Sequence, residues 1–136
     1  MYSKKTGKLI YYGYWVKNDK YSTGKLYNED GKKIYSGLFN KNVRDGFGTS
    51  YYPETGNLKY YGEWVNDMQD GSGIFYYDKN NEEICYEGNW SRNTKDGQGK
   101  LYDTKGVLVF EGLFLSNKWG NDIIIKNLLI SLSLGS

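Results

Sequence analysis

Five glycines recur along the chain at intervals of 24, 25, 26 and 24 residues. These reference glycines are Gly13, Gly37, Gly62, Gly88 and Gly112. A repeat period between about 20 and 50 residues is typical of arrays in which one supersecondary unit is stacked several times. The chain is therefore expected to fold as tandem copies of a short unit that buries a thin stripe against its neighbours, rather than as a two-layer globule.

The spacing within each copy predicts a β-hairpin. In the first four copies a second glycine follows the first after 11 residues, and a tyrosine follows three residues later. The second glycines are Gly24, Gly48, Gly73 and Gly99, and the tyrosines are Tyr27, Tyr51, Tyr76 and Tyr102. Because this spacing is constant, the changes in period fall in the connectors between copies, where a surface turn absorbs an extra residue.

A polar segment separates the two halves of each copy, and in three copies it ends in Asp-Gly. These are the DGFG, DGSG and DGQG segments, whose first glycines are Gly46, Gly71 and Gly97. Asp-Gly favours positive φ and tight reversal, so the sequence predicts the hairpin turn at this point. The first copy has Ser22 where the others have this glycine.

Aromatic residues stand two positions before and two positions after each of the five glycines, and therefore on the same face of the strand. Tyr11 begins the series. The remaining nine form a candidate partner-binding row: Trp15, Tyr35, Phe39, Tyr60, Trp64, Tyr86, Trp90, Phe110 and Phe114. Glycine weakens a strand, so its recurrence implies the close approach of another group, most simply these rings. The rings are expected to hold the array together by stacking, to bind a peptide or helix of a protein partner, or to do both.

The fold class expected from these patterns is all-β, with a single elongated, twisted antiparallel sheet of roughly eight to ten strands. Residues 1–120 are assigned to the array, which begins with a partial repeat. The fifth copy has Ile123 where its second glycine is due, and the apolar segment 121–136 is expected to cap the array. Its apolar spacing fits a helix with Asp122 as N-cap, and alternation at its end fits a strand equally well. Contact with a partner or a membrane is the alternative role for this segment.

Composition argues against catalysis and against nucleic acid binding. The net charge is only +2, from 18 basic and 16 acidic side chains. The chain has no histidine and one cysteine, Cys85, so neither a Ser/His or Cys/His nucleophile pair nor an ordinary zinc site can be built. No cofactor is expected. Glu87 and Glu111 occupy equivalent positions and are expected to be solvated carboxylates opposite Lys or Arg. With one cysteine, no apolar leader and no membrane-spanning stretch, a cytoplasmic location is expected, with membrane association as an option.

Two other binding functions are compatible with the sequence. Lys17, Lys41 and Arg92 share one offset after the repeat glycine, which would align them along the sheet. Each contributes about 1 kcal/mol toward an anionic membrane, so three of them predict weak binding of lipid headgroups at most. Aromatic hairpin repeats also occur in carbohydrate-binding modules, although such modules would carry a secretion signal.

The segments YYGEW at Tyr60–Trp64 and YEGNW at Tyr86–Trp90, each followed by GxG and a tyrosine, resemble the MORN repeat (membrane occupation and recognition nexus). The resemblance covers about residues 8 to 115 and involves five aligned copies. It implies a twisted sheet of hairpins that acts as a non-catalytic scaffold for protein–protein contacts. It also implies self-association and proximity to membranes in some members.

Overall fold

The computed structural model of the protein describes residues 2–4, 7–9 and 21–123. Strands dominate these residues. β1 (Tyr2–Lys4) and β2 (Gly7–Leu9) pair with each other in a two-stranded sheet of their own. The described strands of the N-terminal partial repeat therefore lie outside the main sheet. Tyr11, Gly13, Trp15 and Lys17 lie outside the described residues.

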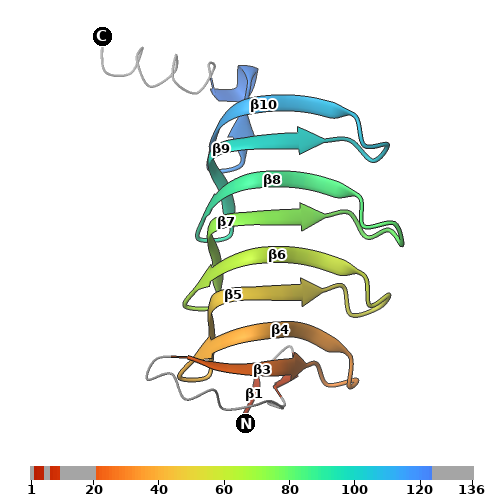
Figure 1. Ribbon diagram of the computed structural model, residues 1–136, viewed down its shortest axis with the longest axis vertical. Coiled ribbons are helices and arrows are strands. Elements are labelled where there is room, and N and C mark those ends of the chain that lie inside the picture. Colours follow the sequence, from red (N-terminus) through yellow and green to blue (C-terminus); the bar gives the residue numbers. More distant parts are fainter. Residues whose placement is uncertain (1, 5–6, 10–20, 124–136) are drawn as a thin grey trace.

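The main sheet is an antiparallel meander of nine strands, in which every strand pairs with its neighbours in sequence. The strands are β3 (Ser22–Tyr27), β4 (Lys33–Asn40), β5 (Val43–Tyr51), β6 (Leu58–Val65), β7 (Met68–Tyr76), β8 (Ile84–Ser91), β9 (Thr94–Tyr102), β10 (Leu108–Leu115) and β11 (Lys118–Trp119). They follow one another along the long axis of the molecule (Figure 1). The predicted all-β class and the elongated sheet of hairpins are confirmed.

The hairpin turns lie within the polar segments where the sequence predicted them, but before the Asp-Gly pairs. Two residues with positive φ connect the two strands of a hairpin, such as Asn66 (49°) and Asp67 (70°) between β6 and β7. The equivalent turns are Lys41–Asn42, Arg92–Asn93 and Ser116–Asn117. Two consecutive left-handed residues form the type I′ turn, whose twist matches that of the flanking strands. The prediction that Asp-Gly makes the reversal is therefore wrong.

The Asp-Gly segments instead lie inside the second strand of each hairpin. Gly71 belongs to β7 and has a φ of 105°, and Gly46 and Gly97 are equivalent to it in β5 and β9. Between the pairs Gly62–Gly73 and Trp64–Gln69, β7 contains two more residues than β6, so this segment is a bulge. Positive φ was expected at these glycines and is confirmed, but it produces a bulge rather than a turn.

The reference glycines and the second glycines form one line across the sheet. Each is paired in register with the next, through Gly24, Gly37, Gly48, Gly62, Gly73, Gly88, Gly99 and Gly112. The constant 11-residue spacing thus places the two glycines of one hairpin opposite each other. The connector places them opposite the glycines of the next hairpin.

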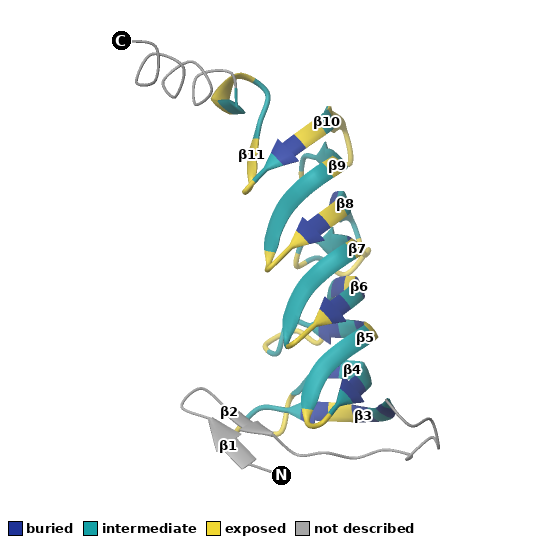
Figure 2. Ribbon diagram, turned by 90° about the vertical axis from the view of Figure 1, so that its left-hand side faces the viewer, coloured by how far each residue is buried: buried dark blue, intermediate teal, exposed yellow. Residues whose placement is uncertain are grey.

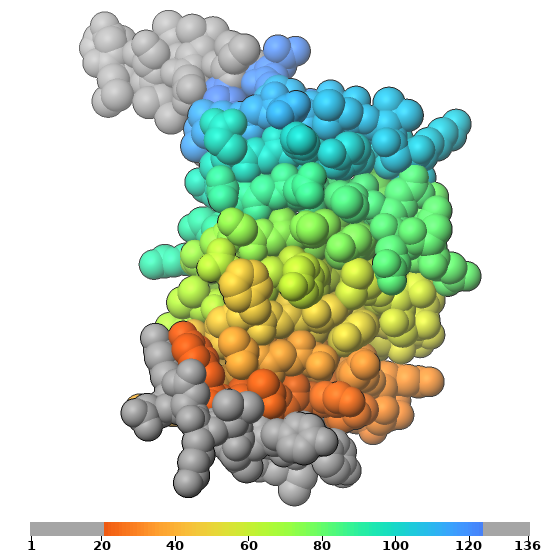
Figure 3. All heavy atoms as spheres, viewed as in Figure 1, coloured from red at the N-terminus to blue at the C-terminus, as the bar shows by residue number. Residues whose placement is uncertain are grey.

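The core is a thin column on one face of this sheet. Buried segments recur at the same place on β4, β6, β8 and β10 (Figure 2). The buried hydrophobic residues are Leu26, Tyr35, Phe39, Tyr60, Trp64, Tyr86, Trp90 and Phe114. Successive hairpins form successive bands across the surface (Figure 3), so each hairpin covers only its neighbours.

The C-terminal end of the sheet is shortened. β11 has two residues, and Phe114 pairs with Trp119 and Leu115 with Lys118. Residues 121–123 are helical, so this helix begins one residue before the Asp122 expected as its N-cap. The rest of the predicted cap, 124–136, lies outside the described residues.

Candidate functional site

The aromatic row is a ladder of edge-to-face contacts that runs from hairpin to hairpin. The ring of Trp64 lies between Tyr60 of its own hairpin and Tyr35 of the preceding one, with both centroid distances at 5.3 Å. Trp90 lies in the same way between Tyr86 and Tyr60, at 5.2 and 5.4 Å. Such pairs contribute about 0.5–1.5 kcal/mol each beyond the area that they bury. The rings therefore join each hairpin to the next.

The tyrosines explain why both glycines of each hairpin are required. Tyr60 lies over the glycine line, and a Cβ built on Gly73 would overlap its hydroxyl, while a Cβ on Gly62 would meet the backbone of Gly73 at 2.5 Å. The Tyr60 hydroxyl donates a hydrogen bond to the carbonyl oxygen of Glu63 at 3.0 Å. Tyr35 and Tyr86 do the same with Leu38 and Asn89, both at 2.8 Å.

Burial raises the pKa values of these tyrosines, because the charged phenolate would lose its hydration. The pKa of Tyr86 rises to about 12, with a further contribution from the nearby carboxylate of Asp96, and the hydrogen bond to Asn89 partly opposes the shift. Burial also raises the pKa of Tyr35 and of Tyr60. The three side chains are therefore neutral packing elements at physiological pH.

The two tryptophans add hydrogen bonds between hairpins. The indole N–H of Trp64 donates to the carbonyl oxygen of Gly48 at 3.2 Å, and that of Trp90 donates to Gly73 at 3.1 Å. Both bonds are buried. Each bond gives an acceptor to an indole N–H that would otherwise be buried without a hydrogen bond.

Most of the predicted partner-binding row is thus occupied by its own neighbours. Tyr35, Phe39, Tyr60, Trp64, Tyr86, Trp90 and Phe114 are at most 6% exposed. Phe110 is partly buried, and Trp15 lies outside the described residues. The rings contact one another from hairpin to hairpin, as the stacking interpretation expects. The apolar groups that remain partly open on this face are Ile34, Phe75, Leu101, Phe110 and Trp119.

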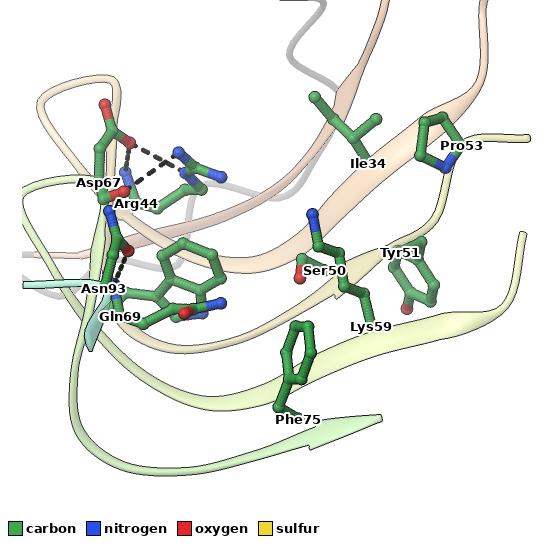
Figure 4. A pocket seen from close by; sticks show the side chains of 11 residues that line it. Ile34, Arg44, Ser50, Tyr51, Pro53, Lys59, Asp67, Gln69, Phe75 and Asn93 are labelled. Atoms are coloured by element: carbon green, nitrogen blue, oxygen red, sulfur yellow. Dashed lines mark hydrogen bonds and ion pairs between the residues drawn. The ribbon is translucent and has the colours of Figure 1, made fainter. Parts of the chain in front are cut away.

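A hollow of about 750 Å³ opens on this face beside Trp64 (Figure 4). Its lining combines apolar and polar groups: Ile34, Arg44, Ser50, Tyr51, Pro53, Lys59, Trp64, Asp67, Gln69, Phe75 and Asn93. The Arg44 guanidinium forms an ion pair with Asp67 at 3.1 Å and lies 4.5 Å from the centroid of the Trp64 ring. Arg44 thus connects the hairpin turn of one repeat to the aromatic column.

Aspartate and asparagine side chains join three hairpin turns to the preceding repeat, a role that sequence reasoning missed. We call these pairs of hydrogen bonds clasps. The Asp70 carboxylate, next to the bulge, accepts a hydrogen bond from the backbone N–H of Arg92 at 3.4 Å. In return, the Asn93 side chain accepts one from the backbone N–H of Gln69 at 2.8 Å. The sequence contains a signal for these hydrogen bonds. Asp recurs before the bulge glycine, and Asn or Asp recurs five residues after the reference glycine.

The opposite face of the sheet is mixed. Phe47 and Tyr61 are about half exposed, at 54% and 50%. Lys100 stands in register between Glu87 on one neighbouring strand and Glu111 on the other. The prediction that these two carboxylates lie opposite a basic residue is confirmed.

The predicted lipid-binding cations lie at hairpin turns. Lys41 and Arg92 occupy the first position of their turns and are exposed. The equivalent residues of two other turns, Asn66 and Ser116, are uncharged. The cations therefore do not form a continuous positive line in the part of the chain that the structure describes. Within the same residues, no helix is long and apolar enough to cross a membrane. No cluster of three or more His, Cys, Asp or Glu side chains suited to a metal ion occurs in these described segments.

An open meander in which each hairpin contacts only the next defines a repeat protein of the solenoid type. The repeating features are the glycine line, the aromatic ladder and the clasps. The MORN repeat family matches residues 35–55, 60–82 and 86–108, each of which begins at or next to the buried tyrosine of a hairpin. The chain belongs to this family, whose repeats are in general non-catalytic modules of protein or membrane interaction. No curated protein matches the chain.

Proposed function

We propose that this protein is a non-catalytic MORN-repeat scaffold that binds a segment of a partner protein on the aromatic side of its sheet. The observation that carries the proposal is the combination of a rigid floor and a partly open apolar rim. The floor is the buried ladder of rings. The rim is formed by the partly buried side chains packed against it, such as Phe75 and Leu101.

The chemistry of this side favours a partner that is apolar and acidic. Cations lie over rings along the column: Lys33 is 4.4 Å from the Tyr51 centroid, and Lys95 is 5.7 Å from that of Tyr86. Hairpins recur about every 10 Å, because each contributes two strands. An extended segment or a helix whose apolar side chains and carboxylates alternate at that distance would contact several repeats at once.

The proposal is tested with variants that leave the buried ladder intact, since removing Trp64 or Trp90 would damage the fold itself. Phe75→Ala changes the aromatic side, and Phe47→Ala is the matched change on the opposite face. Proteins captured from native lysate are compared for both variants, after circular dichroism has established that each is folded. A photo-crosslinking residue at position 75 or 47 then identifies the face that touches the partner.

We expect a partner that is lost with Phe75→Ala, is retained with Phe47→Ala and crosslinks from position 75. Retention of every captured protein by Phe75→Ala, or crosslinks from position 47 alone, would contradict the proposal. Self-association is checked in the same experiment, because a second copy of the chain would be recovered as its own partner.

A further inference from the structure

A serine interrupts a second apolar row on the aromatic face. The row crosses the sheet in register two residues from the glycine line, on the same face: Leu26, Tyr35, Ser50, Tyr60, Phe75, Tyr86, Leu101 and Phe110. Leu26, Phe75 and Leu101 occupy the position of Ser50 in the other copies. Ser50 is thus the one residue of this row that lacks a bulky apolar side chain.

The Ser50 hydroxyl is buried without a partner. The residue is 6% exposed, and its Oγ atom has no hydrogen bond. A buried hydroxyl without a hydrogen bond destabilises the fold, so its presence here points to a group that the hydroxyl meets in another state of the protein. Ser50 lines the 750 Å³ hollow, where the shorter side chain leaves room.

A lysine lines the same hollow at another position that is uncharged in the other copies. Lys59 stands three residues before the reference glycine, where the described copies otherwise have Ile34, Cys85 and Val109. Its Nζ lies 5.6 Å from the centroid of the Tyr52 ring. Among the described residues its ammonium has no ion pair, whereas Arg44, on the other side of the hollow, is neutralised by Asp67. The charged groups of the lining therefore leave one positive charge, that of Lys59.

We propose that this hollow, the Ser50–Lys59 site, binds an organic carboxylate with an aromatic or branched apolar body. The carboxylate accepts hydrogen bonds from the Ser50 hydroxyl and from the Lys59 ammonium. The apolar body contacts Tyr51 and Phe75, which also line the hollow (Figure 4). One uncompensated cation matches a monoanion, whereas a phosphate dianion would call for several basic groups. The volume lies within the range of about 300–1,000 Å³ typical of small-molecule sites.

The same chemistry is available from a free carboxylic acid and from the C-terminus of a polypeptide. Three probes distinguish the sources: phenylpropionate, a short peptide that ends in phenylalanine with a free carboxylate, and the same peptide with a C-terminal amide. Phenylpropionamide is the neutral control for the first probe. Binding to the purified full-length chain is followed by NMR chemical shifts and calorimetry. The proposal does not rest on the scaffold function, because no partner protein enters the experiment.

The substitutions that test the site replace Ser50 and Lys59 by the residues found at the equivalent positions of other repeats. Ser50→Leu introduces the residue found at Leu26 and Leu101, so it should fill the hollow and raise the melting temperature while it abolishes binding. Lys59→Ile introduces the residue found at Ile34 and should weaken binding of the carboxylates at least about tenfold, as expected for a charged hydrogen bond. Lys100→Met, on the opposite face, removes the same charge and should leave the affinity unchanged.

The expected result is binding of at least one carboxylate probe, at least about tenfold tighter than its amide, with loss in both Ser50→Leu and Lys59→Ile. Binding of the peptide alone assigns the site to polypeptide C-termini, and binding of phenylpropionate assigns it to free acids as well. Equal affinity for acid and amide, unchanged affinity in Lys59→Ile, or the absence of binding by every carboxylate probe would overturn the proposal. The last result would mean that the hollow holds solvent only.

Discussion

Replacing Gly73 by alanine is expected to disrupt the aromatic ladder from its centre. Gly73 is buried in β7, and an added Cβ would overlap the hydroxyl of Tyr60. Tyr60 cannot move aside without losing packing contacts, because it is 0% exposed and its ring contacts Trp64 and Trp90 at centroid distances of 5.3 and 5.4 Å. The substitution must therefore displace the tyrosine or separate two strands.

The expected loss of stability follows from the contacts of Tyr60. Its hydrogen bond to Glu63 contributes about 0.5–1.5 kcal/mol, and each of its two edge-to-face contacts contributes a similar amount. Losing all three would destabilise the fold by about 1.5–4.5 kcal/mol, in line with overpacked sites in other cores. With a urea dependence of about 2 kcal/mol per molar, the midpoint of unfolding should fall by roughly 1–2 M.

Gly56→Ala is the control, since Gly56 has a φ of 78° and an added Cβ would meet no atom within 4 Å. It should cost only the strain of a left-handed alanine, about 1 kcal/mol. Urea unfolding followed by far-ultraviolet circular dichroism measures both variants. Tyr60→Phe combined with Gly73→Ala should not recover the loss, because the ring carbons Cζ and Cε1 would still overlap the added Cβ. If Gly73→Ala is no more destabilising than Gly56→Ala, the packing argument is refuted.

Three further predictions concern the clasps, the tyrosines and the membrane. Asp70→Ala removes the acceptor for the Arg92 backbone N–H and should lower the free energy of unfolding by about 0.5–1 kcal/mol. The control Asp30→Ala should have no effect. Equal urea midpoints for the two variants would contradict the role of Asp70 in joining the repeats. Stability should be constant up to pH 10 and fall as the pH rises toward 12. The reason is that Tyr86 releases its proton near pH 10.0 when unfolded but near pH 12 when folded, because burial raises its pKa to about 12. Tyr86 by itself contributes a slope of up to ~1.4 kcal/mol per pH unit, and the raised pKa values of Tyr35 and Tyr60 act in the same direction. Urea midpoints across this range test the effect, and Tyr86→Phe should reduce the slope. Vesicles of anionic lipid should bind the chain weakly through residues such as Lys41, and co-sedimentation that persists at about 0.5 M salt would show stronger binding than the exposed charges support.

Much of the fold could be predicted because the relevant information is local. The fixed distance from Gly62 to Gly73 predicts a hairpin, and the alternation of Tyr60, Gly62 and Trp64 assigns them to one face. The structure confirms both. The same pattern could not show whether the rings were open to a partner. That depends on the approach of the next hairpin, which places Tyr60 against Trp90.

The position of the turn could not be read from local chemistry. Asp70–Gly71 and Asn66–Asp67 both favour positive φ, and either pair could reverse the chain. Long-range pairing decides between them. Because Gly62 faces Gly73, and Gly73 faces Gly88, the reversal falls at Asn66–Asp67 and the Asp-Gly segment becomes a bulge. That arrangement leaves the Asp70 carboxylate free to clasp the next turn.

The candidate sites, too, depend partly on local sequence and partly on contacts between hairpins. The sequence by itself determined the repeating unit, its hairpin form and the aromatic face, because these depend on spacing along a single strand. It also contained Ser50 and Lys59 as exceptions to the repeat. Only the tertiary structure brought the two residues to one hollow and left the Ser50 hydroxyl without a partner. Burial and charge compensation arise from the packing of neighbouring hairpins, and no single copy of the repeat contains them.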